Sequence, residues 1–370
     1  MEWEFKQFKL KRRLGWVTIV KISARKRSKD ANKMNSSANS HNNGTSTECE
    51  VVIFLGGRLG PTATFAYVLL LFVMIMNIIT CPITAVLNAL VMLAVRTKPR
   101  LKTKPNIALG CLATTDWIMG AIGQPLFIAE ISLILRGETS STNCWEIQLS
   151  KHILRVLGTA SLIHVALMNV ERYIAIKQAL AYITTATGSR ILRLSALAWI
   201  TALILTVPVA IMDNNIYLTV SNITLSSCMV ITIYCQVVIY FETRRHEKQM
   251  AAHQVSVETK EKFLKEKKAF KVTTTVVLIL VLNYAPIIVV RILIVKSVID
   301  SVNAAYICFF ITSSVAILNS LINPIIYCVR IRHFRVAFIE IVLRKNNAQA
   351  EEFEMQIFGL NAVAPLEQEH

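Results

Sequence analysis

Seven long runs of apolar residues, separated by short polar stretches, dominate the pattern along the chain. The runs cover residues 65–95, 105–133, 147–176, 191–212, 217–241, 270–295 and 304–329. Each is near or above the roughly 20 residues that an α-helix needs to cross a bilayer. None shows the ten-residue alternation typical of a membrane β-strand. The pattern therefore predicts an all-α membrane protein built as a seven-transmembrane helix bundle.

The residues after the last run predict one more helix. Residues 330–343 combine apolar positions with Arg330, Arg332 and Arg335, as in an amphipathic helix that lies on the inner membrane surface with its arginines toward the headgroups. The predicted organisation is an N-terminal extracellular tail (1–64), the transmembrane bundle (65–329), this short amphipathic eighth helix (330–343) and a cytoplasmic tail (344–370).

Composition narrows the class of protein. Hydrophobic residues make up 54% of the chain and charged residues only 17%, whereas a soluble domain carries about 25% charge. This excludes a cytosolic enzyme and makes the lipid bilayer a partner. The net charge of +17 does not indicate binding to nucleic acid, because much of it lies in short loops between apolar runs.

The loop charges predict the orientation. The connection 96–104 has five basic and no acidic residues, and the third and fifth connections are also basic, whereas the second and fourth are not. Basic loops mark the cytoplasmic side, which predicts a plasma-membrane protein with an extracellular N-terminus and a cytoplasmic C-terminus. Two glycosylation sequons support this orientation, at Asn35 and Asn43.

Residues 1–33 do not fit an extracellular tail well, because they contain 11 basic and 3 acidic residues. Two interpretations stay open. Translation begins at Met34, so that residues 1–33 are not in the mature protein, or the chain keeps a basic extension.

Polar residues inside the apolar runs occur in a recognisable order. From the first run to the seventh they include Asn88, Asp116, Glu171-Arg172-Tyr173, Trp199, Pro208, Pro286 and Asn323-Pro324-Ile325-Ile326-Tyr327, with Phe334 beyond. Together they resemble the signature of rhodopsin-like (class A) G-protein-coupled receptors over residues 65–343. The resemblance implies a receptor that is not an enzyme, needs no cofactor and activates heterotrimeric G proteins. It gives Asn88, Trp199 and Pro208 structural roles.

The sequence also departs from the family pattern. Tyr284 stands where the family has a tryptophan before Pro286, and the resemblance assigns this pair to a toggle in the sixth helix. The short outer loops and the fifth-run proline replaced by Thr232 are loosely similar to the melanocortin branch. There is also a loose likeness to adenosine receptors, although Arg291 stands where they carry an amide. The partner of Cys144 in a disulfide stays open among Cys49, Cys228 and Cys308.

The resemblance implies a switch at the inner side of the bundle. Arg172 keeps its charge at any accessible pH, so it needs a partner or water. Glu171 is expected to point elsewhere, because neighbouring positions lie about 100° apart on a helix. Glu266 holds the family's partner position, which predicts an Arg172–Glu266 bridge that breaks as the sixth helix moves outward. The alternative is two interfacial charges that reach the headgroups.

Other residues of the implied switch lie in the fifth and seventh helices. Tyr327 is expected to turn inward and meet Tyr240 near Arg172, with Asn323-Pro324 supplying the bend. The full predicted set is Glu171, Arg172, Tyr173, Tyr240, Glu266, Asn323, Pro324 and Tyr327.

Asp116 lies inside the second run, where a charge is costly and usually marks function. The resemblance places four oxygen-bearing side chains around it, those of Ser161, Asn319, Ser320 and Asn323. One carboxylate with neutral oxygens suits an allosteric Na⁺, and no other metal site is predicted. The alternative is a polar network filled with water around a protonated Asp116.

The outer half gives less information about the extracellular ligand. Amine receptors carry an aspartate at the position of Leu154, which argues against a biogenic amine. Lys151, Arg155 and Arg291 predict an anionic ligand instead, through bidentate contacts. The alternative is that Arg155 pairs with Glu130 inside the protein or is solvated at the rim of the bundle.

Two further expectations follow. Residues 336–370 contain no Ser, Thr or Tyr, so arrestin binding is expected to be weak or to depend on Thr243, Ser256 and Thr259 of the fifth connection. A seven-span transporter or channel is the alternative function. It would need charges along a path through several helices, and Asp116 is the only midplane charge that the sequence offers.

Overall fold

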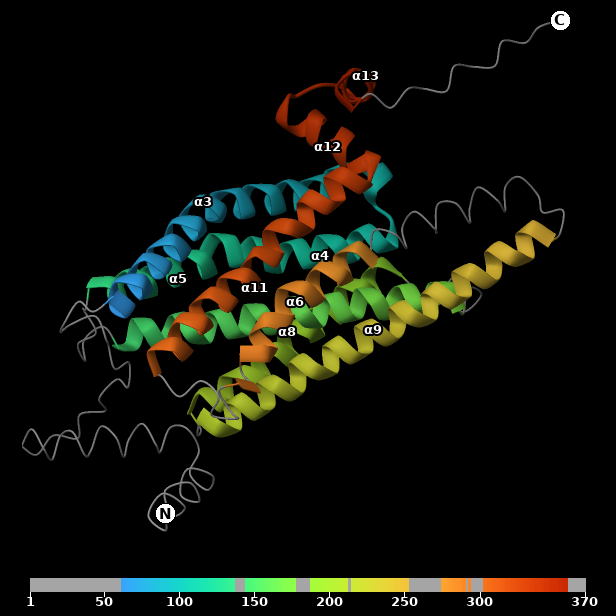
Figure 1. Ribbon diagram of the computed structural model, residues 1–370. Helices are drawn as coiled ribbons and strands as arrows, with labels where there is room; N and C mark the ends of the chain where they lie inside the picture. The colour runs from blue at the N-terminus through green and yellow to red at the C-terminus, as the bar shows by residue number, and fades with distance from the viewer. Residues whose placement is uncertain are drawn as a thin grey trace, which may run out of the picture.

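A computed structural model describes residues 61–136, 144–177, 187–211, 214–252, 274–290, 292–293 and 302–358 of the chain. In these ranges all regular structure is helical, with no strand. The long helices run side by side in an elongated bundle, with α12 (Arg332–Val342) and α13 (Asn347–Phe358) at one end (Figure 1).

Within the described residues, six helical spans are long and apolar enough to cross a membrane, and a shorter apolar helix, Thr274–Val290, accompanies them. Their outward faces expose large apolar side chains such as Phe72, Ile79 and Leu203, as expected for a bundle solvated by lipid. The helix bounds are α3 (Pro61–Thr97), α4 (Lys104–Ile118), η2 (Met119–Gly123), α5 (Gln124–Arg136), α6 (Cys144–Lys177), α8 (Gly188–Ile211), α9 (Asn214–Ala252), α11 (Val302–Arg330), α12 (Arg332–Val342) and α13 (Asn347–Phe358), with the 3₁₀ turn η1 (Pro99–Leu101) after α3. The predicted seven-helix bundle with a further amphipathic helix is confirmed.

The second span contains a π-helical turn, η2, between α4 and α5. Pro125 follows this turn and cannot donate a backbone hydrogen bond, so the local ladder has to be rearranged. Gly120 lies so close to α3 that an added Cβ would come within 2.7 Å of the Ala85 nitrogen. The thiol of Cys81 donates to the Gly120 carbonyl oxygen at 3.2 Å. The absence of a side chain at Gly120 therefore fixes how closely the first two spans approach.

Helix α9 continues well past the predicted inner limit at residue 241 and ends at Ala252. The expectation of a loop from residue 242 was wrong for this stretch, because ion pairs support a polar helix there. Arg244 and Arg245 pair with Glu247 and Glu242 at 3.3 and 3.8 Å. As a result, Thr243, predicted as an accessible loop residue, is a buried helical residue.

The cysteines limit the disulfide alternatives. Cys228 and Cys308 are both free thiols, so neither is the partner of Cys144. Of the three predicted partners only Cys49 is left, and it lies outside the described residues.

The inner end of the bundle has its own hydrophobic cluster. Tyr327 of α11 is fully buried, and its ring packs against Phe334 of α12 with the centroids 5.9 Å apart. Phe334 and Ala337 of α12 join residues of α3, α4 and α6 in this cluster. The apolar face of α12 therefore packs on the bundle and fixes the inner end of α11.

Two buried carboxylates form ion pairs that fix the positions of α12 and α13. Glu340 of α12 forms ion pairs with Lys98 and Arg100 in the connection between the first two spans. Glu354 of α13 pairs with Arg332 Nε at 3.0 Å and Arg335 Nη2 at 2.7 Å. Although burial alone raises the pKa of Glu354, hydrogen bonds from these guanidinium groups outweigh it and lower the pKa.

The expectation that Arg335 faces the lipid headgroups was therefore wrong, because only 10% of its side chain is exposed, whereas Arg332 keeps 47% of its side chain exposed. Both bind Glu354 of α13, a helix that we did not predict. Arg330 is exposed at the end of α11. The contacts tie the C-terminal segment to the bundle by charge as well as by apolar packing.

We expect Glu340→Ala to lower the free energy of unfolding by about 2 kcal/mol, because the loss leaves two partly buried cations without their carboxylate. Glu351→Ala is the matched control. Glu351 is 42% exposed and lies 3.9 Å from Arg100, so its loss should cost less than about 1 kcal/mol. Thermal unfolding of the purified protein in detergent would measure both. Equal effects of the two changes would contradict a structural role for the buried carboxylate.

Candidate functional site

Asp116 is the centre of a buried polar cluster between α4, α6 and α11. Its side chain is fully buried. Ser320 Oγ donates to Oδ1 at 2.7 Å, and Asn323 Nδ2 donates to Oδ2 at 2.8 Å. Ser161 Oγ lies 3.5 Å from Oδ1. The structure thus brings three of the four predicted neighbours onto the carboxylate.

Asn319, the fourth predicted neighbour, is bonded elsewhere. Its Oδ1 accepts a hydrogen bond from Asn283 Nδ2 of the Thr274–Val290 helix at 3.4 Å. Asn88 lies beside the cluster and donates to the Ser320 carbonyl oxygen at 3.0 Å, which joins α3 to α11. The polar cluster therefore connects the first, second, third and seventh spans, and the separate Asn283–Asn319 bond joins the sixth span to the seventh.

The groups around Asp116 fit a small hard cation. Its carboxylate and the hydroxyls of Ser161 and Ser320 offer oxygen ligands of the kind that such ions prefer. Among the described residues no group of three His, Cys, Asp or Glu side chains gathers to hold a metal. A single carboxylate neutralises one positive charge, so the arrangement suits a monovalent ion better than a divalent one.

Arg172 lies at the inner end of α6 with most of its side chain buried. Its Nε is 3.5 Å from Glu171 Oε2, and both side chains are less than 15% exposed. The expectation that Glu171 points elsewhere was wrong, because two long side chains can close the 100° between adjacent helical positions. Glu266, the predicted partner, lies outside the described residues.

Tyr240 and Tyr327 occupy different environments. Tyr327 is fully buried, and its hydroxyl has no hydrogen-bond partner within the described part of the chain. Tyr240 is 45% exposed, and its hydroxyl accepts a hydrogen bond from Arg244 Nε at 3.4 Å. Tyr173 packs instead against Tyr234 of α9, with the ring centroids 6.4 Å apart.

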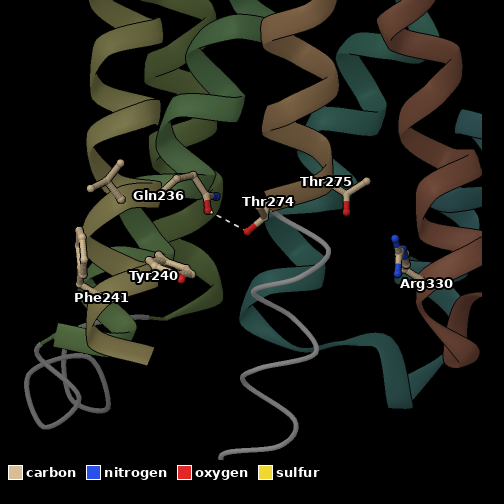
Figure 2. A pocket seen from close by; sticks show the side chains of 7 residues that line it. Gln236, Tyr240, Phe241, Thr274, Thr275 and Arg330 are labelled. Carbon is tan, nitrogen blue, oxygen red and sulfur yellow. Dashed lines mark hydrogen bonds between the residues drawn. The ribbon is translucent and has the colours of Figure 1, made fainter. Parts of the chain in front are cut away.

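A cavity of about 620 Å³ opens at the inner end of the bundle. Figure 2 shows its lining side chains, which come from α9, from the start of the Thr274–Val290 helix and from the end of α11. We call it the inner cavity; it is lined by Gln236, Val237, Tyr240, Phe241, Thr274, Thr275 and Arg330. Only Tyr240 among these residues was predicted as functional, because apolar helix faces do not reveal which of them separate to leave a space.

The outer half contains a buried acid with two partners. Glu130 is 2% exposed, accepts a hydrogen bond from Ser150 Oγ at 2.9 Å and lies 4.0 Å from Lys151 Nζ. Arg155 Nη1 also lies 3.3 Å from His152 Nδ1. Lys151 is thus an ion-pair partner of Glu130 that we did not predict. Arg291 lies outside the described residues.

The remaining predicted residues are mostly packing residues in the structure. Leu154 lies against the outer hydrophobic cluster, and Tyr284 is buried in a cluster with Leu112 and Leu280. Trp199 lies 6.2 Å from the ring of His164. Pro286 is in the Thr274–Val290 helix and Pro208 in α8, where its side chain is not described. Asn35 and Asn43 lie outside the described residues.

Comparison with known proteins agrees with this geometry. The family described as 7 transmembrane receptor (rhodopsin family) matches residues 87–327. The alpha-2A adrenergic receptor of Danio rerio is 32% identical over 122 residues, which is 33% of this chain and 30% of that protein. The 5-hydroxytryptamine receptor 1D of Mus musculus is 28% identical over 143 residues, 37% of this chain and 35% of the relative. The chain thus spans about a third of the length of the curated relatives that it matches.

Proposed function

This chain belongs to the rhodopsin family of seven-transmembrane receptors, and from that membership we propose that it is a G-protein-coupled receptor. It senses an extracellular ligand and activates heterotrimeric G proteins through outward movement of the Thr274–Val290 helix. The observation that carries this proposal is the partly buried Arg172–Glu171 pair on α6, at the inner end of a bundle that also has the inner cavity. A cavity between α9, this helix and α11 is where a helix of a G protein could insert.

The switch residues keep the roles that the sequence suggested, as proposals. Arg172 passes between partners, with Glu171 in the described arrangement and Glu266 as a second acceptor. Tyr327 turns from the core toward Tyr240, and its buried hydroxyl without a described partner supports such a movement. Tyr173 packs beside α9, while Asn323-Pro324 provides the bend in α11 and Tyr284 with Pro286 the toggle.

We also propose that Asp116 binds an allosteric Na⁺ together with Ser161, Ser320 and Asn323. Asn319 takes part through Asn283 of the Thr274–Val290 helix, which would couple the ion to that helix. The short contacts of Asp116 with α11 support this role. The ion favours the arrangement in which these contacts are made.

The ligand is proposed to be anionic and not a biogenic amine. The relatives are named as adrenergic and 5-hydroxytryptamine receptors, but Leu154 offers no charge for a protonated amine and lies against the outer hydrophobic cluster. Lys151 is already paired with Glu130. The proposed anion contacts are those of Lys151, Arg155 and Arg291.

The test of the function is nucleotide exchange. The receptor is reconstituted in nanodiscs with purified heterotrimers of the different Gα classes, and GTPγS uptake is measured with libraries of acidic metabolites and of amines. We expect at least one acidic ligand to raise exchange and no amine to do so. An amine response would overturn the ligand class, and no exchange on any heterotrimer would overturn the receptor function.

The remaining proposals concern orientation and regulation. We place the protein in the plasma membrane, with residues 1–64 outside, residues 65–329 in the bilayer and residues 330–370 inside. Weak arrestin recruitment is proposed because Thr243 is buried in α9, which leaves Ser256 and Thr259. Recruitment that persists after both are changed to Ala would contradict this. Family membership disfavours the transporter or channel alternative.

A further inference from the structure

Three polar side chains form a continuous bridge across the inner half of the bundle. Gln236 of α9 donates through Nε2 to Asn169 Oδ1 of α6 at 2.5 Å. Thr274, the first described residue of the Thr274–Val290 helix, donates through Oγ1 to Gln236 Oε1 at 3.1 Å. Figure 2 shows the second bond at the edge of the inner cavity. We call Asn169, Gln236 and Thr274 the inner polar bridge.

The hydrogen bonds of the bridge have a fixed order of donors and acceptors. Asn169 is fully buried, and its Nδ2 donates to the Val165 carbonyl oxygen within α6 at 2.8 Å. This leaves Asn169 Oδ1 as the acceptor toward α9, so Gln236 must present its amide nitrogen to Asn169 and its oxygen to Thr274. Because each amide has one donating and one accepting end, the Thr274 hydroxyl completes the chain as the donor to Gln236.

The location of the bridge connects it to the proposed switch. Asn169 precedes Arg172 by less than one helical turn on α6, and Gln236 precedes Tyr240 by about one turn on α9. Gln236 and Thr274 both line the inner cavity. Any outward movement of the Thr274–Val290 helix that widens this cavity separates Thr274 from Gln236.

We propose that the inner polar bridge holds the Thr274–Val290 helix against α6 and α9 in the inactive receptor, and that breaking the Thr274–Gln236 bond is a step of activation. Gln236 is the positioning residue, because it is the one that contacts both partners. Separating the two side chains loses an interhelical hydrogen bond, so the movement is opposed until a ligand or G protein compensates. This inference rests on the proposed function.

The test compares substitutions that remove the hydrogen bond with one that keeps it. Thr274→Val keeps the shape of the side chain and removes its hydroxyl. We expect basal nucleotide exchange to rise about threefold, because an interhelical hydrogen bond in a membrane contributes about 0.6 kcal/mol on average. Gln236→Leu removes the same bond to the moving helix and should also raise basal exchange by about threefold, because the Gln236–Asn169 bond does not involve that helix. Thr274→Ser retains the hydroxyl and should behave like the wild type.

The matched control is Thr312→Val in α11. The Thr312 hydroxyl donates to the Cys308 and Phe309 carbonyl oxygens of its own helix, so the same chemical change leaves the contacts between helices in place. We expect unchanged basal exchange in this variant. A purely structural role for Thr274 predicts instead that both valine variants lose thermal stability without a rise in exchange.

A second measurement separates the bridge from the proposed function. Spin labels are introduced as unnatural amino acids at Lys271 and at Arg193 of α8, because the chain has eight cysteines, and their distance is measured by pulsed electron resonance in nanodiscs. Thr274→Val and Gln236→Leu should increase the population with the longer distance, whereas Thr274→Ser and Thr312→Val should not. A longer distance without G-protein activation would overturn the proposed function and keep the bridge. Unchanged distances in the first two variants would overturn the bridge.

Discussion

Replacing Arg172 with Gln is expected to reduce ligand-stimulated nucleotide exchange by roughly 30-fold or more. The guanidinium group is largely buried beside Glu171, and no other described side chain at this end of α6 offers its planar set of donors. Removing one member of a buried charge pair costs about 3–5 kcal/mol, and a loss of only 2 kcal/mol corresponds to about a 30-fold change in an equilibrium. GTPγS uptake by reconstituted heterotrimers measures the loss.

Two further variants make this prediction specific. Arg193→Gln removes a guanidinium from an exposed position at the start of α8, so exchange should stay within about twofold of the wild type, as for most surface changes. Arg172→Lys keeps the charge but loses the bidentate fork, and its activity should fall between those of the wild type and Arg172→Gln. Wild-type exchange in Arg172→Gln, at matched amounts of folded receptor, would remove Arg172 from the switch.

The spans of the bundle could be predicted because the bilayer imposes a simple rule. A helix that crosses it must be apolar for about 20 residues, and the runs around Asn88 and Asp116 obey this rule. The rule does not apply outside the bilayer. The inner extension of α9 and all of α13 depend on ion pairs, such as Arg335–Glu354, between residues whose approach requires the folded bundle. A short polar helix is marginal in isolation, so its sequence alone does not predict it.

The residues of the candidate site also fall into those that the sequence predicts and those that it does not. The neighbours of Asp116 could be predicted because each belongs to a motif at a fixed place in its helix. Gln236 and Thr274 belong to no such motif. Gln236 is one polar residue in an apolar run, and Thr274 is the middle of three consecutive threonines. Only the crossing of α6, α9 and the Thr274–Val290 helix brings them into contact. The Glu171–Arg172 pair was missed for a different reason, because side-chain length outweighs the angle between neighbouring positions.

Changing Asp116 to Asn should remove the proposed dependence of the receptor on sodium. In the wild type we expect about 0.15 M NaCl to raise the unfolding temperature relative to KCl at equal ionic strength. A ligand at ten times its dissociation constant stabilises the folded state by about 1.4 kcal/mol, which corresponds to an increase of a few degrees, roughly 2–5 °C. Asn lacks the carboxylate charge that binds the cation, so Asp116→Asn should unfold at the same temperature in both salts.

The control for this prediction is the substitution of a different buried polar residue, Ser314 of α11. Ser314 Oγ accepts a hydrogen bond from Asn77 Nδ2 at 2.7 Å, in a separate network from Asp116, so Ser314→Ala should lower stability equally in both salts and keep the sodium effect. Ser161→Ala should reduce the effect in part, because it removes a neutral oxygen and leaves the charge. If the wild type unfolded at the same temperature in both salts, or if Asp116→Asn kept the difference, Asp116 would act only as a hydrogen-bonded link between α4 and α11.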